Sequence, residues 1–596
     1  MEPLVIAVAG LIAIAVCAQL GPRIGVASPL ILLALGALIG FLPFVDPIAL
    51  DPALVLEAIL PPLLFGAAAS MPVMDFRRDL AVVAGLAIGL VVVTTLLLGL
   101  VVHALIPTIA LPWAIALGAV LSPTDAVAVS IARNQGVSYR VVTVLEGEGL
   151  FNDATALVLL GAGVSAALQV DAEALAPTML ALDFVVALLV AIAIGFVVGE
   201  LGVRARARIT EPAADTVLSF AMPFLASIPA EHLGGSGLVA AVVAGLVVSH
   251  RRIALIPAQN RRFAQQNWAT LEFVLEGAVF LTMGLQAYGI VTTVNGGDYG
   301  LGRAALVALV AGALTLVARA LFVAPFLAFL ASKSRRQKVR LERFDEAMAF
   351  HEERIAHACD AADELMAERN LSKEQWDAAI ARRRQRVEKG RRRAARKGRD
   401  VDYFLREPLR AREGSVLVWA GMRGAVTLAA AQTLPLSAPA RSFLLLIALL
   451  VAAGSLSIQG LTLPVLIRAA KPQMAVDSHD EEERERLLLL LRSTLKETAL
   501  ARAITEAHPA PALGRTSSPI DLRASVRKGI VVEGEDGPRR EPLFGEERAR
   551  ELAIEAIHAQ RAALIEARDD RVFSSAALER ALERIDYEEI MLSTKH

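Results

Sequence analysis

The chain has 596 residues, a net charge of −1 and 55% hydrophobic residues, and its mean hydropathy is +0.53. This composition is too apolar for an ordinary soluble enzyme and excludes that class. Apolar runs of about 18 residues or more recur from Met1 to about Ala470, and each could cross a ~30 Å bilayer core as one helix. We therefore expect an all-α polytopic membrane protein.

We predict about 13 transmembrane helices. The first carries Glu2 and lacks a basic leading segment, so we expect a retained span and not a cleaved signal peptide. In chain order the spans cover roughly residues 3–20, 28–44, 50–69, 80–104, 110–132, 142–167, 177–202, 214–230, 235–250, 268–290, 302–332, 414–434 and 442–468.

The arginines in the connecting loops predict the orientation. Basic residues in short loops stay on the cytoplasmic side. One set of alternate loops carries twelve arginines, and the opposite set carries only Arg303 and Arg441. This asymmetry places the N-terminus outside and the C-terminus in the cytoplasm.

The spans divide as six, one and six, which would give two inverted six-helix repeats. The fifth span, with "LSPTDAVAV", and the twelfth, with "WAGMRGAVTL", hold matching positions in the two halves. Each carries charge and a helix-weakening residue halfway along, Pro123 in one and Gly421 and Gly424 in the other. Paired interrupted helices point to an ion-binding site, whereas two ordinary kinked helices would leave these charges facing loops.

The sixth span, "LEGEGLFNDATALVLL", holds Glu146, Glu148 and Asp153 in an otherwise apolar setting. Asp153 lies thirteen residues after Arg140, about 20 Å along a helix and so near the bilayer midplane. For Glu148 we expect a structural ion pair with Arg423. For Asp153 we find no spare base, so we expect this carboxylate to bind a proton and a monovalent cation in competition, which produces exchange.

The segments "EGEGLFNDATALV", "LSPTDAVAV", "HLGGSGLVAAVVAGL" and "VWAGMRGAVTLAAA" resemble the bacterial branch of the cation:proton antiporter-1 family, the sodium/proton exchangers. The resemblance covers about Met1 to Ala470. It implies a homodimer in the bacterial inner membrane, interrupted crossing helices, elevator-like alternating access and no organic cofactor. It also implies one-for-one, electroneutral exchange of Na⁺, or alternatively K⁺, for H⁺.

The resemblance also implies roles for individual residues. Asp153 would carry the cation and the proton, Asn152 would organise the site, and Thr124 would offer oxygen ligands. Asp125 would neutralise the positive ends of the half-helices, and Glu148 and Arg423 would form the structural pair.

This chain departs from the family pattern at Gly66, where many relatives have an acidic residue, and at Gly149, where they have a serine. Glu272 and Glu276 of the tenth span are candidate additional ligands that could supply the missing oxygen, although either could instead face solvent or pair with loop arginines. Glu57 of the third span is open to both interpretations.

Two polar regions accompany the transmembrane domain, which covers 1–332 and 414–470. The insert 333–413 contains 23 basic and 16 acidic residues, hence a net charge of +7, and we expect a cytoplasmic helical segment. It either contacts anionic lipid headgroups or merely secures topology. The tail 471–596 is interrupted by a Pro/Gly-rich stretch and is expected to be a regulatory or dimerising appendage.

Other classes of protein remain open at this level. The two cysteines, Cys17 and Cys359, indicate neither a disulfide nor a metal site, and nothing indicates nucleic-acid binding. A cation channel would also need intramembrane carboxylates, but interrupted inverted helices favour alternating access. A transport-inactive sensor working through the insert and tail is a further alternative.

Overall fold

The computed structural model describes residues 3–593 except 25–26, 43–50, 72, 169–176, 298, 361–365, 367–371, 475–476, 503–529, 535–536, 542–544 and 571. Its elements are α1 (Pro3–Ile24), α2 (Ser28–Gly40), η1 (Leu54–Ile59), α3 (Leu60–Ser70), α4 (Val73–Ala84), η2 (Gly85–Leu90), α5 (Val91–Leu105), α6 (Leu111–Leu121), α7 (Val127–Asn134), α8 (Tyr139–Leu168), α9 (Pro177–Arg206), α10 (Pro212–His232), α11 (Gly237–Leu255), α12 (Ala258–Asn295), α13 (Gly300–Asp360), α15 (Lys373–Arg406), α16 (Ala411–Trp419), α17 (Ala425–Gln432), α18 (Arg441–Ala470), α19 (Asp477–Glu497), β1 (Ile530–Gly534), β2 (Gly537–Glu541), α22 (Glu546–Asp569) and α23 (Ser575–Ser593).

The membrane region is built from apolar helices. Within the described residues, eight helices are long and apolar enough to cross a bilayer, and shorter apolar helices accompany them. This confirms a multi-pass, helical membrane protein. The count of 13 spans and their inverted repeat stay predictions, and the predicted ends of the second and third spans fall partly outside the described residues.

Two of the apolar helices are interrupted at the predicted places. Residues 122–126 separate α6 from α7, and residues 420–424 separate α16 from α17. Pro123 lacks a backbone N–H, and Gly421 and Gly424 lack side chains that would hold a helix, so the breaks have local causes. The two breaks meet, because the Asp125 N–H donates to the Met422 carbonyl at 2.7 Å.

Close helix packing surrounds this crossing. A Cβ added to Gly36 of α2 would lie 2.4 Å from the Leu281 carbonyl of α12, so these helices touch backbone to backbone. Small residues permit such contacts in membranes, where packing takes over from the hydrophobic effect.

Individual helix starts are also encoded locally. Ser236 caps α11 by accepting from the Val239 N–H at 3.4 Å.

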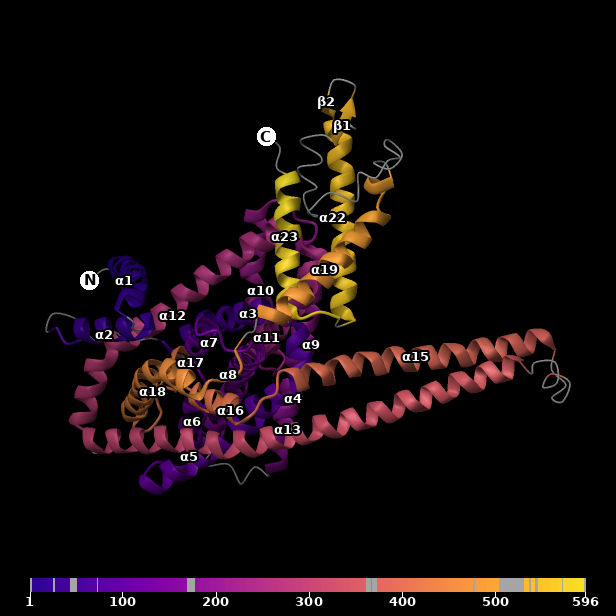
Figure 1. Ribbon diagram of the computed structural model, residues 1–596. Coiled ribbons are helices and arrows are strands. Elements are labelled where there is room, and N and C mark those ends of the chain that lie inside the picture. The colour runs from indigo at the N-terminus through magenta and orange to yellow at the C-terminus, as the bar shows by residue number, and fades with distance from the viewer. Residues whose placement is uncertain are drawn as a thin grey trace.

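Helix α13 passes through residue 333, where the predicted insert begins, and runs unbroken to Asp360. Helix α15 returns antiparallel to it, and the two project away from the remaining helices (Figure 1). The end of α15 is fixed at the base, where Arg78 pairs with Asp400 at 3.3 Å and the Tyr403 hydroxyl donates to Asp79 at 3.3 Å. Asp79 in turn pairs with Arg140 at 2.9 Å. The division of the chain into domains stays a prediction.

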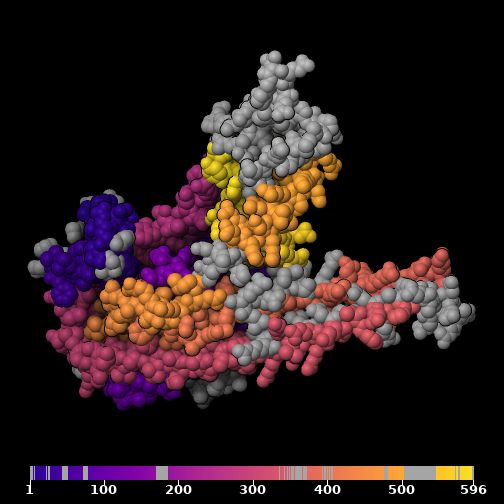
Figure 2. Space-filling model, in the orientation of Figure 1, coloured from indigo at the N-terminus to yellow at the C-terminus, as the bar shows by residue number. Residues whose placement is uncertain are grey.

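The tail forms a second projection. Its helices α19, α22 and α23 share a hydrophobic core that includes Leu491, Ile557 and Leu564, and they rise apart from the insert (Figure 2). The expectation of an all-α chain needs one correction here, since β1 and β2 form an antiparallel hairpin. Its signal in the sequence is the Asp-Gly pair of "VVEGEDGPRRE", because Asp-Gly favours a hairpin connection.

Candidate functional site

Asp125 lies where the two broken helices cross. Its Oδ1 accepts from the Val127 N–H at 2.8 Å, at the start of α7, and its Oδ2 accepts from the Ala425 N–H at 3.2 Å, at the start of α17. A helix N-terminus carries partial positive charge. One carboxylate therefore accepts hydrogen bonds from the first N–H groups of both half-helices.

Arg423 performs the opposite task at the half-helix ends. It is buried, and its Nε donates to the Leu121 carbonyl of α6 at 2.9 Å. Its Nη1 donates to the Gly421 carbonyl, just beyond the end of α16. Because helix C-termini carry partial negative charge, Arg423 compensates both of them.

The expected pair of Glu148 with Arg423 is wrong. Glu148 is paired with Arg319 of α13, whose Nη2 donates to Oε2 at 2.7 Å and whose Nη1 donates to Oε1. The Arg319 Nε also donates to the Leu417 carbonyl at 2.8 Å, which fixes the guanidinium in place. Arg423 instead donates from Nε and Nη1 to carbonyls at the helix ends.

The sequence contains a signal for Arg319, which the predicted Glu148–Arg423 pair did not include. Arg319 is a lone base inside the apolar run "LVALVAGALTLVARALFVAPFLAFL". An ionisable residue inside a membrane helix needs a partner, so this run indicates Arg319 as a second candidate partner of Glu148.

Asp153 and Asn152 bring acceptor oxygens to the same region from α8. Both are buried. The Asn152 amide Nδ2 donates to Thr124 Oγ1 at 3.3 Å and to the Ser122 carbonyl at 3.4 Å, which joins α8 to the first break. Asn152 Oδ1 and Asp153 Oδ1 accept no hydrogen bond from any described residue. A buried unpartnered carboxylate is costly, so this site is suited to a proton or a cation.

Helix α12 adds two further carboxylates one turn apart. Glu276 interacts electrostatically with Asp125, and Asp153 interacts electrostatically with Glu276. Glu272 Oε1 is buried without a partner among the described residues. It lies only 2.2 Å from the place where a Cβ on Gly66 would be. The Glu272 carboxylate thus fills the space that Gly66 leaves open.

Two of the remaining candidates, Glu146 and Glu57, have other surroundings, and Gly149 borders the cluster without adding a ligand. Glu146 pairs with the exposed Arg133, and Glu57 is exposed on η1. A Cβ on Gly149 would meet only the Thr124 carbonyl, at 4.0 Å. No group of three or more His, Cys, Asp or Glu in the described part of the chain could hold a metal ion.

Crossed half-helices with a buried carboxylate beside them define a secondary transporter of small ions. The chain belongs to the sodium/hydrogen exchanger family, whose transmembrane model, "Sodium/hydrogen exchanger, transmembrane", matches residues 10–342. Members of this family are monovalent cation/proton antiporters, not enzymes, and need no cofactor.

Similarity to known proteins extends beyond residues 10–342 of the family match. An uncharacterised Na⁺/H⁺ exchanger of Mycobacterium tuberculosis is 28% identical over 612 residues, which cover 99% of this chain and 96% of that protein. A sodium, potassium, lithium and rubidium/H⁺ antiporter of Bacillus pumilus is 32% identical over 274 residues, 45% of this chain and 40% of that one. The structure of the sodium proton antiporter MjNhaP1 from Methanocaldococcus jannaschii aligns with a TM-score of 0.54 at 16% identity, covering 79% of this chain and 100% of that one.

Proposed function

We propose that this chain exchanges one monovalent cation for one proton, with the Asp153 carboxylate as the shared carrier. The observation that carries the proposal is the buried Asp153 Oδ1, which no described donor satisfies. An ionised carboxylate at this depth is costly unless a positive charge accompanies it. A proton and a cation can each remove that cost, and one carboxylate holds only one of them at a time.

Electroneutral exchange follows from this single carrier. Asp153 is neutralised equally by H⁺ and by a monovalent cation, so the site crosses without net charge in either occupied form. The empty, ionised form is penalised by desolvation. Occupied forms therefore cross and the empty form does not, which makes the exchange obligatory.

The ligands proposed for the cation are oxygens, as hard cations prefer. Asp153 supplies the charge, and Asn152 Oδ1 and Thr124 supply neutral oxygens. Glu276 and Glu272 are the candidate additional ligands. Asp125 belongs to the site mainly through the half-helix starts, since both of its oxygens already accept backbone N–H groups.

Sodium is the first choice of cation on the strength of the family. Potassium is the alternative, supported by the Bacillus pumilus relative, whose name includes sodium, potassium, lithium and rubidium. The biological role would be pH and sodium homeostasis.

The architecture that would support this exchange has about 13 spans in two inverted repeats, an elevator-like movement and a homodimer. The N-terminus would lie outside a bacterial plasma membrane and the tail in the cytoplasm. The domain limits would be 1–332, 333–413, 414–470 and 471–596. The insert, with its net charge of +7, would contact anionic lipid headgroups.

The test is reconstitution in liposomes that hold a pH-sensitive dye, with the membrane potential clamped at zero. Sodium, potassium, lithium or choline is added to wild type, to Asp153→Asn and to Glu146→Gln. The last variant is a matched control, because Glu146 lies on the same helix but pairs with the exposed Arg133.

We expect a cation-dependent pH change in wild type and in Glu146→Gln, and none in Asp153→Asn. The ranking of cations identifies the substrate. Uptake of a radioactive cation tracer by the same liposomes without a pH change would indicate a channel. No flux with any cation, in protein shown to be inserted, would overturn the proposal and favour a sensor.

A further inference from the structure

A cavity of about 160 Å³ lies on the side of the membrane region that faces the tail. It is lined by residues of α3, α9, α10, α11 and α12, among them Gly66, Arg206, Arg252, Arg261 and Glu272. Arg261 is three residues from the start of α12, and Glu272 is eleven residues further along, about 16 Å deeper at the rise of a helix. The cavity therefore has arginines at its tail-facing mouth and an unpartnered carboxylate oxygen farther in.

Arginines at the mouth of a path for cations are unfavourable, because they repel the ion before it reaches Glu272. Arg206 is compensated within the membrane region, since it donates two hydrogen bonds of 2.8 Å to Asp215. Arg252 and Arg261 form no ion pair with any described carboxylate of that region. Two positive charges at the mouth thus need compensation from elsewhere.

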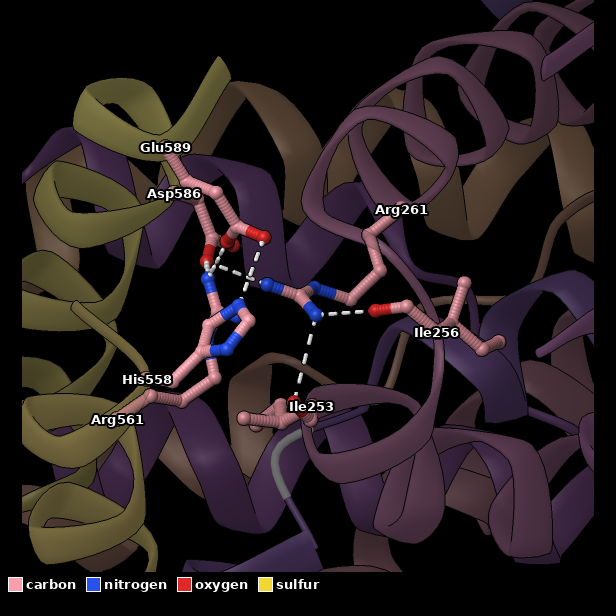
Figure 3. A network of polar contacts seen from close by, with 7 residues as sticks. All are labelled: Ile253, Ile256, Arg261, His558, Arg561, Asp586 and Glu589. Atoms are coloured by element: carbon pink, nitrogen blue, oxygen red, sulfur yellow. Dashed lines mark hydrogen bonds and ion pairs between the residues drawn. The ribbon is translucent and has the colours of Figure 1, made fainter. Parts of the chain in front are cut away.

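The tail supplies the compensating negative charge for Arg261. Asp586 of α23 pairs with Arg261, whose Nη1 also donates to the Ile253 carbonyl at 3.3 Å and to the Ile256 carbonyl (Figure 3). Asp586 also accepts from Arg561 of α22 at 2.8 Å. Arg561 has a second carboxylate partner, Glu589, so the charge of Asp586 stays available to Arg261.

A second tail carboxylate lies within electrostatic range of Arg252. Glu579 of α23 interacts electrostatically with Arg252 and with Arg133, and it accepts a hydrogen bond from Tyr139. Apolar and backbone contacts hold the tail in this position. Ile253 packs against the tail core, and Arg568 donates to the His250 carbonyl at 3.5 Å.

We propose that this cavity is the entrance for the transported cation on the side of the tail. The docked tail makes this entrance favourable for cations, because its carboxylates neutralise the arginines at the mouth. Asp586 and Glu579 neutralise Arg261 and Arg252 at the mouth, and Glu272 is the acceptor farther in. The inference rests on the proposed function and adds its regulation. It also predicts the direction of the effect: a docked tail raises the apparent affinity for the cation, whereas an autoinhibitory tail would lower the rate of exchange.

The test uses full-length protein in everted membrane vesicles, where protease sensitivity verifies that the tail faces the bath. The KM for sodium is measured from the sodium-dependent collapse of a pH gradient. The variants are Asp586→Asn, Arg261→Gln and the double variant. The matched control is Glu551→Gln, which removes a carboxylate from α22 whose partner, Arg548, is also exposed.

We expect Asp586→Asn to raise the KM about fivefold, the size of one incompletely screened charge. Arg261→Gln should lower the KM, the double variant should return it toward wild type, and Glu551→Gln should leave it unchanged. Misfolding of a variant would lower the amplitude of its sodium-dependent pH change, but it could not lower the KM. Added choline chloride should shrink all the differences by screening.

Two results would overturn the inference alone: a KM in Asp586→Asn that equals or falls below that of wild type, or a double variant no better than Asp586→Asn. Wild-type vesicles in which neither sodium, potassium nor lithium moves protons would instead overturn the proposed function, and the inference with it.

Discussion

The Asp125 carboxylate occupies the space in which a side chain on Gly424 would have to begin. A Cβ at Gly424 would lie 1.1 Å from Asp125 Oδ2, the oxygen that accepts the Ala425 N–H at 3.2 Å. The glycine therefore permits one carboxylate to reach the starts of both half-helices, α7 and α17. The crossing depends on the missing methyl group as much as on the charge.

Gly424→Ala should therefore abolish exchange and lower the melting temperature of the purified protein. The added methyl must displace Asp125, which leaves two helix starts uncompensated. Gly454→Ala is the control, because a Cβ there meets nothing within 4 Å and alanine favours a helix by up to about 1 kcal/mol. Equal activity in the two variants would show that Asp125 does not need its present position.

Removal of Arg319 should destabilise the protein more than removal of both partners of its ion pair. Arg319→Ala leaves Glu148 as an uncompensated buried charge, which costs about 3–5 kcal/mol. The double variant Arg319→Ala, Glu148→Gln removes both charges and should recover much of that loss. Thermal unfolding in detergent measures the difference, and purely additive effects in the double-variant cycle would contradict a direct pair.

Arg423→Ala should also destabilise the protein, but Glu148→Gln should not rescue it. Arg423 compensates the carbonyls of Leu121 and Gly421 and is not the hydrogen-bonding partner of Glu148. The same unfolding measurement therefore separates the two arginines. Rescue of Arg423→Ala by Glu148→Gln would instead support the ion pair of Glu148 with Arg423 that the sequence predicted.

These arginines illustrate how far the sequence leads. The breaks at Pro123 and at Gly421 and Gly424 could be predicted because proline and glycine weaken a helix wherever it packs. The partner of Glu148 could not be chosen from spacing, because Arg319 and Arg423 are 171 and 275 residues away along the chain. That choice depends on how the helices cross.

The tail shows the same limit more strongly. Its charged helices could be expected from composition, but nothing local links Asp586 to Arg261. Their pairing joins segments more than 300 residues apart. It depends on the packing of α22 against α23, in which Glu589 pairs with Arg561. Glu272 lies between these extremes. Gly66 indicated a missing carboxylate, and the structure places Glu272 Oε1 against Gly66.

Gly66→Ala should lower the apparent affinity for the cation, whereas Gly149→Ala should be tolerated. An added Cβ at Gly66 would lie 2.2 Å from Glu272 Oε1 and 2.8 Å from the Trp268 ring, so Glu272 must move. An added Cβ at Gly149 meets only the Thr124 carbonyl at 4.0 Å, an ordinary contact. Sodium titrations of both variants in liposomes measure the KM. If Glu272 has no part in transport, Gly66→Ala will show a normal KM.

The packing of the tail should weaken in acid through Glu589. Burial raises the pKa of Glu589, but hydrogen bonding to the Arg561 guanidinium outweighs it, so the pKa lies below its ordinary value of 4.5. A carboxyl whose pKa is lower in the folded state stabilises that state above its unfolded pKa. This contribution is lost as the pH falls through the lowered folded value. Since Glu589 is partly exposed, the loss should be modest.

Hydrogen exchange of peptides from α22 and α23 in the full-length protein measures this effect. Wild type should lose protection relative to Glu589→Gln as the pH falls below about 4.5, because the variant has no carboxyl to titrate. The intrinsic pH dependence of exchange is common to both proteins and cancels in the ratio. A ratio that stays constant with pH would mean that the Arg561–Glu589 contact contributes nothing to the packing of these helices.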